Sequence, residues 1–218
     1  MWESIAQDVN SKASVHFIRE VSMKQSGQVI IIDPSNITNY NLTHPELEAT
    51  LIFWIFAAGH NAKSTAKGVE QFLGEIYSKT LKNTPFAAMR ELDWHKVVLI
   101  LSGSGLGCWR VKSRTLYELI HSNLNLKTCS IEDLEKVFGI GPKTARCFVM
   151  HSRPNIRAAG LDTHLLKFLR DKGISVPKST PTGKRYKELE QQFLKLCDEA
   201  NKTPAAYDLE IWRNYSKN

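Results

Sequence analysis

The sequence predicts a mainly α-helical protein, and two observations carry this prediction. Apolar residues recur at helical spacing along most of the chain, and one segment alone, residues 28–33, has the composition of a strand. That segment ends at Pro34 and would need a partner from residues 12–24 to form a sheet. We therefore expect at most a minor β element near the N-terminus.

Helices are expected from Pro45 onward. The first carries Leu47, Leu51, Phe53 and Trp54 and is apolar enough for the centre of a bundle. Periodicity and caps predict further helices, at about residues 62–79, 93–102, 110–123, 130–137, 142–151, 163–172, 184–200 and 204–214. Loops are expected between them, at residues 102–107, 123–128, 152–159 and 175–183.

The composition favours a polyanionic partner. The chain has 29 Lys and Arg against 22 Asp and Glu, for a net charge of +7 and an isoelectric point near 9.2. Basic residues recur beside glycine turns, in the groups Arg110, Lys112, Arg114; Arg146, Arg153, Arg157; and Lys184, Arg185, Lys187. Each group alone is also what a solvated face would show, so only their recurrence favours nucleic acid.

Cysteine spacing and hydropathy indicate the cellular compartment in which the protein works. The four cysteines have neither zinc-ligand nor disulfide-framework spacing, which indicates free thiols in a reducing compartment. No apolar run is long enough for a membrane span, and the N-terminus lacks the pattern of a secretory signal. We expect a soluble intracellular protein, in the cytoplasm or nucleoid of a prokaryote or the nucleus of a eukaryote.

The most informative segment is residues 134–146, which predicts two short helices joined by a tight turn. Gly139 and Gly141 break the first helix, and Pro142 suits the first position of the second, which Thr144 continues. The amides of Gly139, Gly141 and Lys143 then lack intrahelical acceptors at the positive end of a helix dipole, an arrangement that suits a phosphate. The glycines alone are equally compatible with an ordinary helical hairpin.

Lys143 and Asp162 are the candidate catalytic residues. Lys143 lies in the first helical turn, where the dipole opposes its charged form; without burial or neighbouring cations it would be only a surface lysine. Asp162 precedes the helix expected at 163–172, so it could be simply an N-cap. The pair is more informative than either residue, because antiparallel packing of the two helices would bring amine and carboxylate together.

The residues GIGPKTA followed by LDTH resemble the signature of the helix-hairpin-helix (HhH-GPD) DNA glycosylase superfamily, which includes endonuclease III and the 8-oxoguanine glycosylases. The resemblance implies a two-lobed helical fold. One lobe would comprise residues 1–44 plus about 160–218, and a central bundle of about 45–159 would contain the hairpin at 130–151. It also implies double-stranded DNA with an oxidised base as the partner, no membrane, and a monomer.

Within the superfamily, the chain is most similar to the archaeal-type 8-oxoguanine DNA glycosylases. The shared stretches are Lys184-Arg185-Tyr186 with Leu189 and Glu190, and then DLEIW at residues 208–212. Only Cys197 lies beyond Asp162, so the iron–sulfur cluster of many endonuclease III-like members is not expected. No cofactor is implied as a requirement, although the hairpin could bind a monovalent cation. The short tail ending Lys217-Asn218 departs from the archaeal group.

The resemblance implies that Lys143 attacks C1′ of the damaged nucleotide, while Asp162 activates the amine and stabilises positive charge on the sugar. A Schiff base and β-elimination 3′ to the lesion would follow. Gly139, Gly141, Lys143 and Thr144 would form the phosphate-binding hairpin. Two alternatives stay open: an endonuclease III-like glycosylase for oxidised pyrimidines, and a non-catalytic helix-hairpin-helix module that only binds DNA.

The pocket and the wedge that fills the gap in the duplex have weaker candidates. Trp212 and either Phe53 or Trp54 could stack on an extruded base, and Asp208 could accept a proton from its edge. Trp54 fits the core better than the pocket, and Trp212 fits either. Two turns could supply intercalating side chains, with the candidates His60, Asn61, Trp109 and Arg110. Both turns could instead be plain helix caps.

Overall fold

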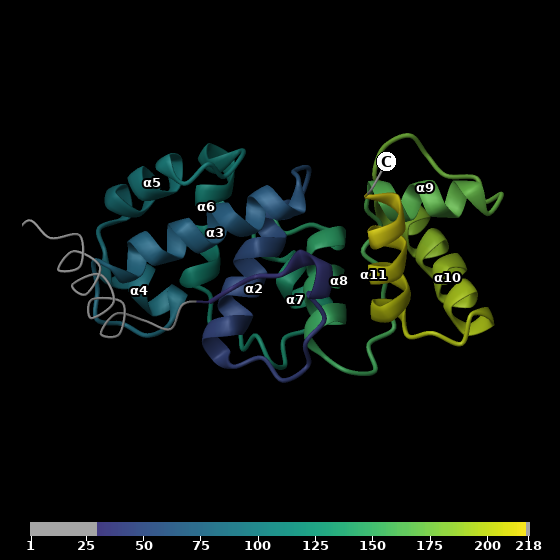
Figure 1. The fold of residues 1–218 in the computed structure, drawn as a ribbon, viewed down its shortest axis with the longest axis horizontal. Coiled ribbons are helices and arrows are strands. Elements are labelled where there is room, and N and C mark those ends of the chain that lie inside the picture. The colour runs from purple at the N-terminus through teal and green to yellow at the C-terminus, as the bar shows by residue number, and fades with distance from the viewer. Residues whose placement is uncertain (1–29, 217–218) are drawn as a thin grey trace, which may run out of the picture.

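The computed structural model describes residues 30–216, and the fold is seen in Figure 1. The described residues form α-helices and one 3-10 turn and contain no strand, so the prediction of a mainly α fold is confirmed. The elements, in chain order, are η1 (Pro34–Asn36), α2 (His44–Ala57), α3 (Ala62–Tyr77), α4 (Pro85–Glu91), α5 (Trp94–Gly103), α6 (Trp109–Ile120), α7 (Ile131–Glu135), α8 (Pro142–Ser152), α9 (Thr163–Asp171), α10 (Gly183–Glu199) and α11 (Pro204–Tyr215).

Helix α2 is the centre of the larger apolar cluster. Ten of its 14 residues are buried, which agrees with the apolar composition that predicted a central helix. It packs against α3, α8, α4 and α6, and the cluster around it extends from Ile32 to Val149. The site-bearing helix α8 is therefore anchored on the central helix of this cluster.

A second, smaller cluster joins α9, α10 and α11. Its buried side chains run from Ala159 to Ile211 and include Phe168, Tyr186 and Phe193. In Figure 1 these three helices stand beside α8, and α11 contacts both α8 and α9. Two helical units thus meet along α8 and α11.

The N-terminal segment lies across this junction. Ile32 packs in the larger cluster, and Arg213 of α11 donates hydrogen bonds to the carbonyl oxygen of Ser35. The segment therefore touches both units. The division into lobes at residues 44 and 160 stays a prediction.

Two details differ from the sequence prediction. Residues 30–33 form no strand; the amide of Ile32 donates to the Glu70 carboxylate at 2.9 Å instead of to a neighbouring strand. The rest of the expected strand and its partner region, 12–24, lie outside the described residues. Helix α4 was not predicted, although Thr84, whose side chain caps it, and Pro85 at its first position are ordinary signals of a helix start.

Candidate functional site

The hairpin between α7 and α8 has the geometry that its two glycines suggest. Gly139 has φ +80°, and a Cβ atom there would lie 2.2 Å from Oγ1 of Thr115, so only glycine fits this turn against α6. Gly141 is the N-cap of α8 without a side-chain cap, and Pro142 follows it. The first amides of α8 therefore have no acceptor within the helix and are available to an anion.

Helix α6 supports the outer side of this turn. Glu118 accepts a hydrogen bond from the amide of Phe138 at 3.3 Å and pairs with Arg114 at 2.9 Å. The Arg114 guanidinium in turn lies 3.9 Å from the centre of the Phe138 ring. A cation and an exposed aromatic ring thus stand beside the anion-accepting end of α8.

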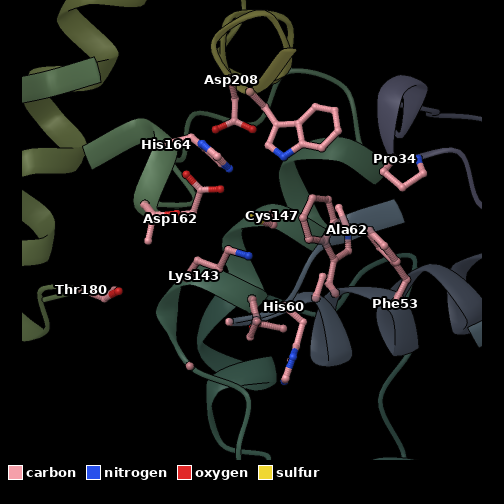
Figure 2. Close-up of a pocket in the computed structure, with 18 of the residues that line it drawn as sticks. Pro34, Phe53, His60, Ala62, Lys143, Cys147, Asp162, His164, Thr180 and Asp208 are labelled. Carbon is pink, nitrogen blue, oxygen red and sulfur yellow. The ribbon is translucent and has the colours of Figure 1, made fainter. Parts of the chain in front are cut away.

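Lys143 leaves the first turn of α8 and points into a cavity rather than into open solvent, as Figure 2 shows. Its Nζ atom lies 5.4 Å from the centre of the Trp54 ring, within the range of a cation–π interaction. The side chain is half-buried. The lysine is therefore held against the Trp54 ring.

Asp162 is the N-cap of α9, as one reading of the sequence proposed. Its Oδ1 accepts a hydrogen bond from the amide of Leu165 at 2.8 Å, while the side chain also lines the cavity. Burial raises the pKa of Asp162, and Asp208 raises it further; Lys143 and the Leu165 amide act in the opposite direction. The N-cap role and a catalytic role of Asp162 are thus compatible, because one carboxylate oxygen suffices for the cap.

The cavity has a volume of about 730 Å³ and lies where α2, α8, α9 and α11 meet. Figure 2 shows the Lys143 amine and the carboxylates of Asp162 and Asp208 directed into it. Its lining includes all four predicted pocket residues, namely Phe53, Trp54, Asp208 and Trp212. The fold therefore brings the proposed catalytic pair and the proposed base-binding side chains to one place, from segments far apart in the sequence.

Two cavity residues on α8 were missed by sequence reasoning. Cys147 and His151 follow Lys143 at intervals of four residues, and this helical spacing could have placed them on its face. Burial raises the pKa of the Cys147 thiol, and Lys143 opposes this effect without reversing it. Cys147 is consequently a protonated, apolar part of the lining.

Of the four wedge candidates, His60 and Asn61 line the cavity. A Cβ atom at Gly107 would lie 2.1 Å from Cε1 of His60, so the two candidate turns touch each other. Asn61 caps α3 through a bond from the amide of Ser64, and Trp109 packs partly against the larger apolar cluster. Arg110 is exposed, with its guanidinium 5.3 Å from the Trp109 ring. The wedge role itself stays a prediction.

Lys112 is turned inward rather than toward solvent. Its Nζ donates to the carbonyl oxygens of Phe56 and Ala58, at 3.1 and 3.2 Å, where α2 ends. Burial lowers the pKa of Lys112, and the positive charge of Lys143 lowers it further. The lysine thereby fixes the turn that leads to His60.

A buried network fixes the main chain that carries Asp162. The Tyr186 hydroxyl accepts a bond from the amide of Leu161 at 3.0 Å and donates to the carbonyl of Ala159 at 2.7 Å. Glu190 accepts from the amide of Ala159 and from Arg146, which lies on α8 with Lys143. Helix α10, which carries Tyr186 and Glu190, thus links the segment that precedes Asp162 to α8, the helix of Lys143.

The second basic group, Arg146, Arg153 and Arg157, does not form a free positive face. Arg146 is buried between Glu135 and Glu190, and Arg157 pairs with Asp198. Arg153 donates to the carbonyl oxygens of Leu126 and Cys129. Arg146 and Arg153 are therefore used inside the fold, while Arg157 stays at the surface in an exposed ion pair.

A family model described as the helix-hairpin-helix motif matches residues 124–149. The chain is also similar in structure to the 8-oxoguanine DNA glycosylase of Thermotoga maritima, with 20% identity, a TM-score of 0.61 and coverage of 90% of this chain and 89% of the other. The enzyme of the same name from Methanocaldococcus jannaschii gives 20% identity, a TM-score of 0.62 and coverage of 92% and 89%.

A further similar structure is the Methanocaldococcus jannaschii 8-oxoguanine glycosylase/lyase in complex with a 15mer DNA containing 8-oxoguanine. It matches with 20% identity, a TM-score of 0.61 and coverage of 96% of this chain and 94% of that chain. The predicted resemblance is thus confirmed for the hairpin motif and for the fold.

Two features are absent from residues 30–216. No described helix has the length and hydropathy for a membrane crossing. No group of three or more His, Cys, Asp or Glu side chains in this part is arranged to hold a metal ion.

Proposed function

We propose that this protein is a base-excision-repair enzyme, a bifunctional DNA glycosylase and AP lyase that removes 8-oxoguanine from duplex DNA. The observation that carries the proposal is the convergence of Lys143 and Asp162 on one cavity at the start of the hairpin helix. The similarity in structure to 8-oxoguanine DNA glycosylases, at 20% identity, supports the substrate class.

The proposed chemistry needs an amine and a carboxylate at C1′. The neutral Lys143 amine bonds to C1′ as the bond from C1′ to the base breaks; the amine loses a proton and the departing base gains one. Asp162, which lines the same cavity, would stabilise positive charge on the sugar with its carboxylate and carry that proton.

Strand cleavage follows from the covalent intermediate. Opening of the sugar ring breaks the bond from C1′ to O4′, gives O4′ a proton and leaves a protonated imine on Lys143. The imine acidifies C2′, so loss of a C2′ proton expels the 3′ phosphate as the bond from C3′ to its oxygen breaks. Water then hydrolyses the imine and releases the lysine.

The remaining cavity residues suit an extruded purine. Trp212 and Trp54 offer aromatic faces for stacking, with the buried Phe53 packed edge-on against Trp54, and the Asp208 carboxylate is an acceptor beside them. 8-Oxoguanine carries N–H at N7, where guanine has a lone pair, so an acceptor favours the lesion. His60 and Asn61, with Trp109 and Arg110 on the adjoining turn, are the proposed filling groups.

The hairpin is the proposed phosphate contact, through the amides of Gly139, Gly141, Lys143 and Thr144. We propose duplex DNA bound by a monomer. No cofactor is required by the chemistry above, and a monovalent cation bound to hairpin carbonyl oxygens could bridge them to a DNA phosphate.

The test is single-turnover cleavage by the full chain on otherwise identical duplexes that carry 8-oxoguanine, thymine glycol or an undamaged base. We expect excision and strand cleavage with 8-oxoguanine and little reaction with the other two. Activity confined to thymine glycol would replace the proposal with an oxidised-pyrimidine glycosylase. Tight binding without cleavage of any duplex would reduce the protein to a DNA-binding module.

A further inference from the structure

His151 is a buried polar side chain that the chemistry above does not use. It lies near the end of α8, is 1% exposed, and touches three separate segments. Its Nδ1 lies 2.7 Å from Oγ1 of Thr38, and its Nε2 lies 3.2 Å from Oδ2 of Asp208. Its ring stacks on Trp54 with centroids 5.4 Å apart and planes inclined by 15°.

The two polar contacts place a donor beside Asp208. An ionised carboxylate can only accept, so the Nε2–H of His151 donates to Oδ2 of Asp208. Thr38 completes the hydrogen bonding of the ring at Nδ1, so both ring nitrogens have a partner. Asp208 is consequently held as an acceptor.

This arrangement bears on the edge of Asp208 that a base would meet. Oδ2 is engaged by His151, while Figure 2 shows the carboxylate reaching into the cavity. An acceptor at this place pairs with the N7–H of 8-oxoguanine and repels the N7 lone pair of guanine. A protonated Asp208 would do the reverse, because it would donate to guanine.

We propose that His151 is a specificity-determining positioning residue that keeps Asp208 an oriented acceptor for the lesion base. The inference rests on the proposed function and adds to it a residue that need not touch the substrate. Thr38 belongs to the same chain of hydrogen bonds, so the segment after η1 takes part in selectivity.

The informative variant is His151→Phe, which keeps a ring against Trp54 and removes both hydrogen bonds. We expect single-turnover excision of 8-oxoguanine to fall at least tenfold, and the preference for 8-oxoguanine over guanine to fall with it. Cleavage of a duplex with a pre-formed abasic site should stay within threefold, because that step needs Lys143 and Asp162 but no base recognition.

His151→Gln retains an amide donor, so its rate of 8-oxoguanine excision should fall less than that of the Phe variant. The matched control is His95→Phe, because His95 is exposed. If the buried variants do not fold, Thr38→Val tests the same chain of bonds, with a smaller excision loss expected and abasic-site cleavage unchanged. Equal losses of both activities in folded protein, or unchanged excision and selectivity, would overturn the role of His151. Failure of the parent protein to excise 8-oxoguanine would instead refute the proposed function.

Discussion

The hydroxyl of Tyr186 should be worth several kcal/mol to this fold, although it is a single oxygen atom. Tyr186→Phe removes the acceptor of the Leu161 amide and the donor to the Ala159 carbonyl, at 3.0 and 2.7 Å. The side chain is buried in the smaller cluster, so the space left by the oxygen is too small to admit water readily. Two buried backbone groups would therefore lose their partners.

The magnitude follows from those two bonds. A buried polar group left without a partner costs about 1 to 3 kcal/mol, so with two such groups the variant should lose about 2 to 6 kcal/mol of unfolding free energy. For a chain of this size, that corresponds to a melting temperature lower by roughly 4 to 24 °C. Asp162 follows Leu161 directly, and even a small displacement of a catalytic group can cost about a hundredfold in rate.

The assay pairs urea unfolding with single-turnover excision at a temperature where the variant remains folded. We expect the stated loss of stability together with at least a tenfold slower excision of 8-oxoguanine. Tyr117→Phe, on the exposed face of α6, is the matched control and should change stability by less than about 0.5 kcal/mol. A loss below 1 kcal/mol with normal excision would refute the view that this hydroxyl positions Asp162.

Two further predictions concern the same segment. Gly160→Ala would place a Cβ atom 2.1 Å from Sγ of the buried Cys147, so thermal unfolding should show a loss of about 1 to 3 kcal/mol in stability. The control is Gly74→Ala, which has open space inside α3 and should be neutral or stabilising. Asp162→Asn keeps a good N-cap, so excision should be lost while unfolding at pH 7 shows a stability no lower than the parent's; loss of folding and activity together would support a purely structural cap.

The sign of the pH effect at Asp162 follows from its raised pKa. Above about pH 3.8 the unfolded chain releases this proton before the folded chain does, so stability contributed by this residue falls as pH rises through the folded pKa. Unfolding measured from pH 4 to 7 should show this decline in the parent and less of it in Asp162→Asn. A parent carboxylate that gained stability over this range relative to the variant would contradict the assigned direction.

The parts of the fold that the sequence predicted are those encoded locally. The apolar run of α2, the Gly and Pro residues of the hairpin, and the Asp162 cap each depend on neighbours within a few residues. Helix α4 was not predicted because its seven residues are too few to show a clear helical period of apolar residues, although Thr84 marks its start.

The cavity could be predicted only in part, because its contacts join distant segments. Lys143 and Asp162 were found through a short motif, whereas the role of His151 depends on Thr38 and Asp208, which lie 113 and 57 residues away. The pairing of charges is hidden from the sequence for the same reason: nothing near Arg146 in the sequence indicates that Glu190 neutralises it.

Borohydride trapping tests most directly whether Lys143 forms a Schiff base with the damaged nucleotide. The parent protein and Lys143→Ala would be incubated with an 8-oxoguanine duplex and borohydride, with Lys136→Ala, an exposed lysine in the same hairpin, as the matched control. We expect a covalent protein–DNA adduct with the parent and with Lys136→Ala, and none with Lys143→Ala. Unchanged trapping by Lys143→Ala, or no adduct with the parent, would contradict the account.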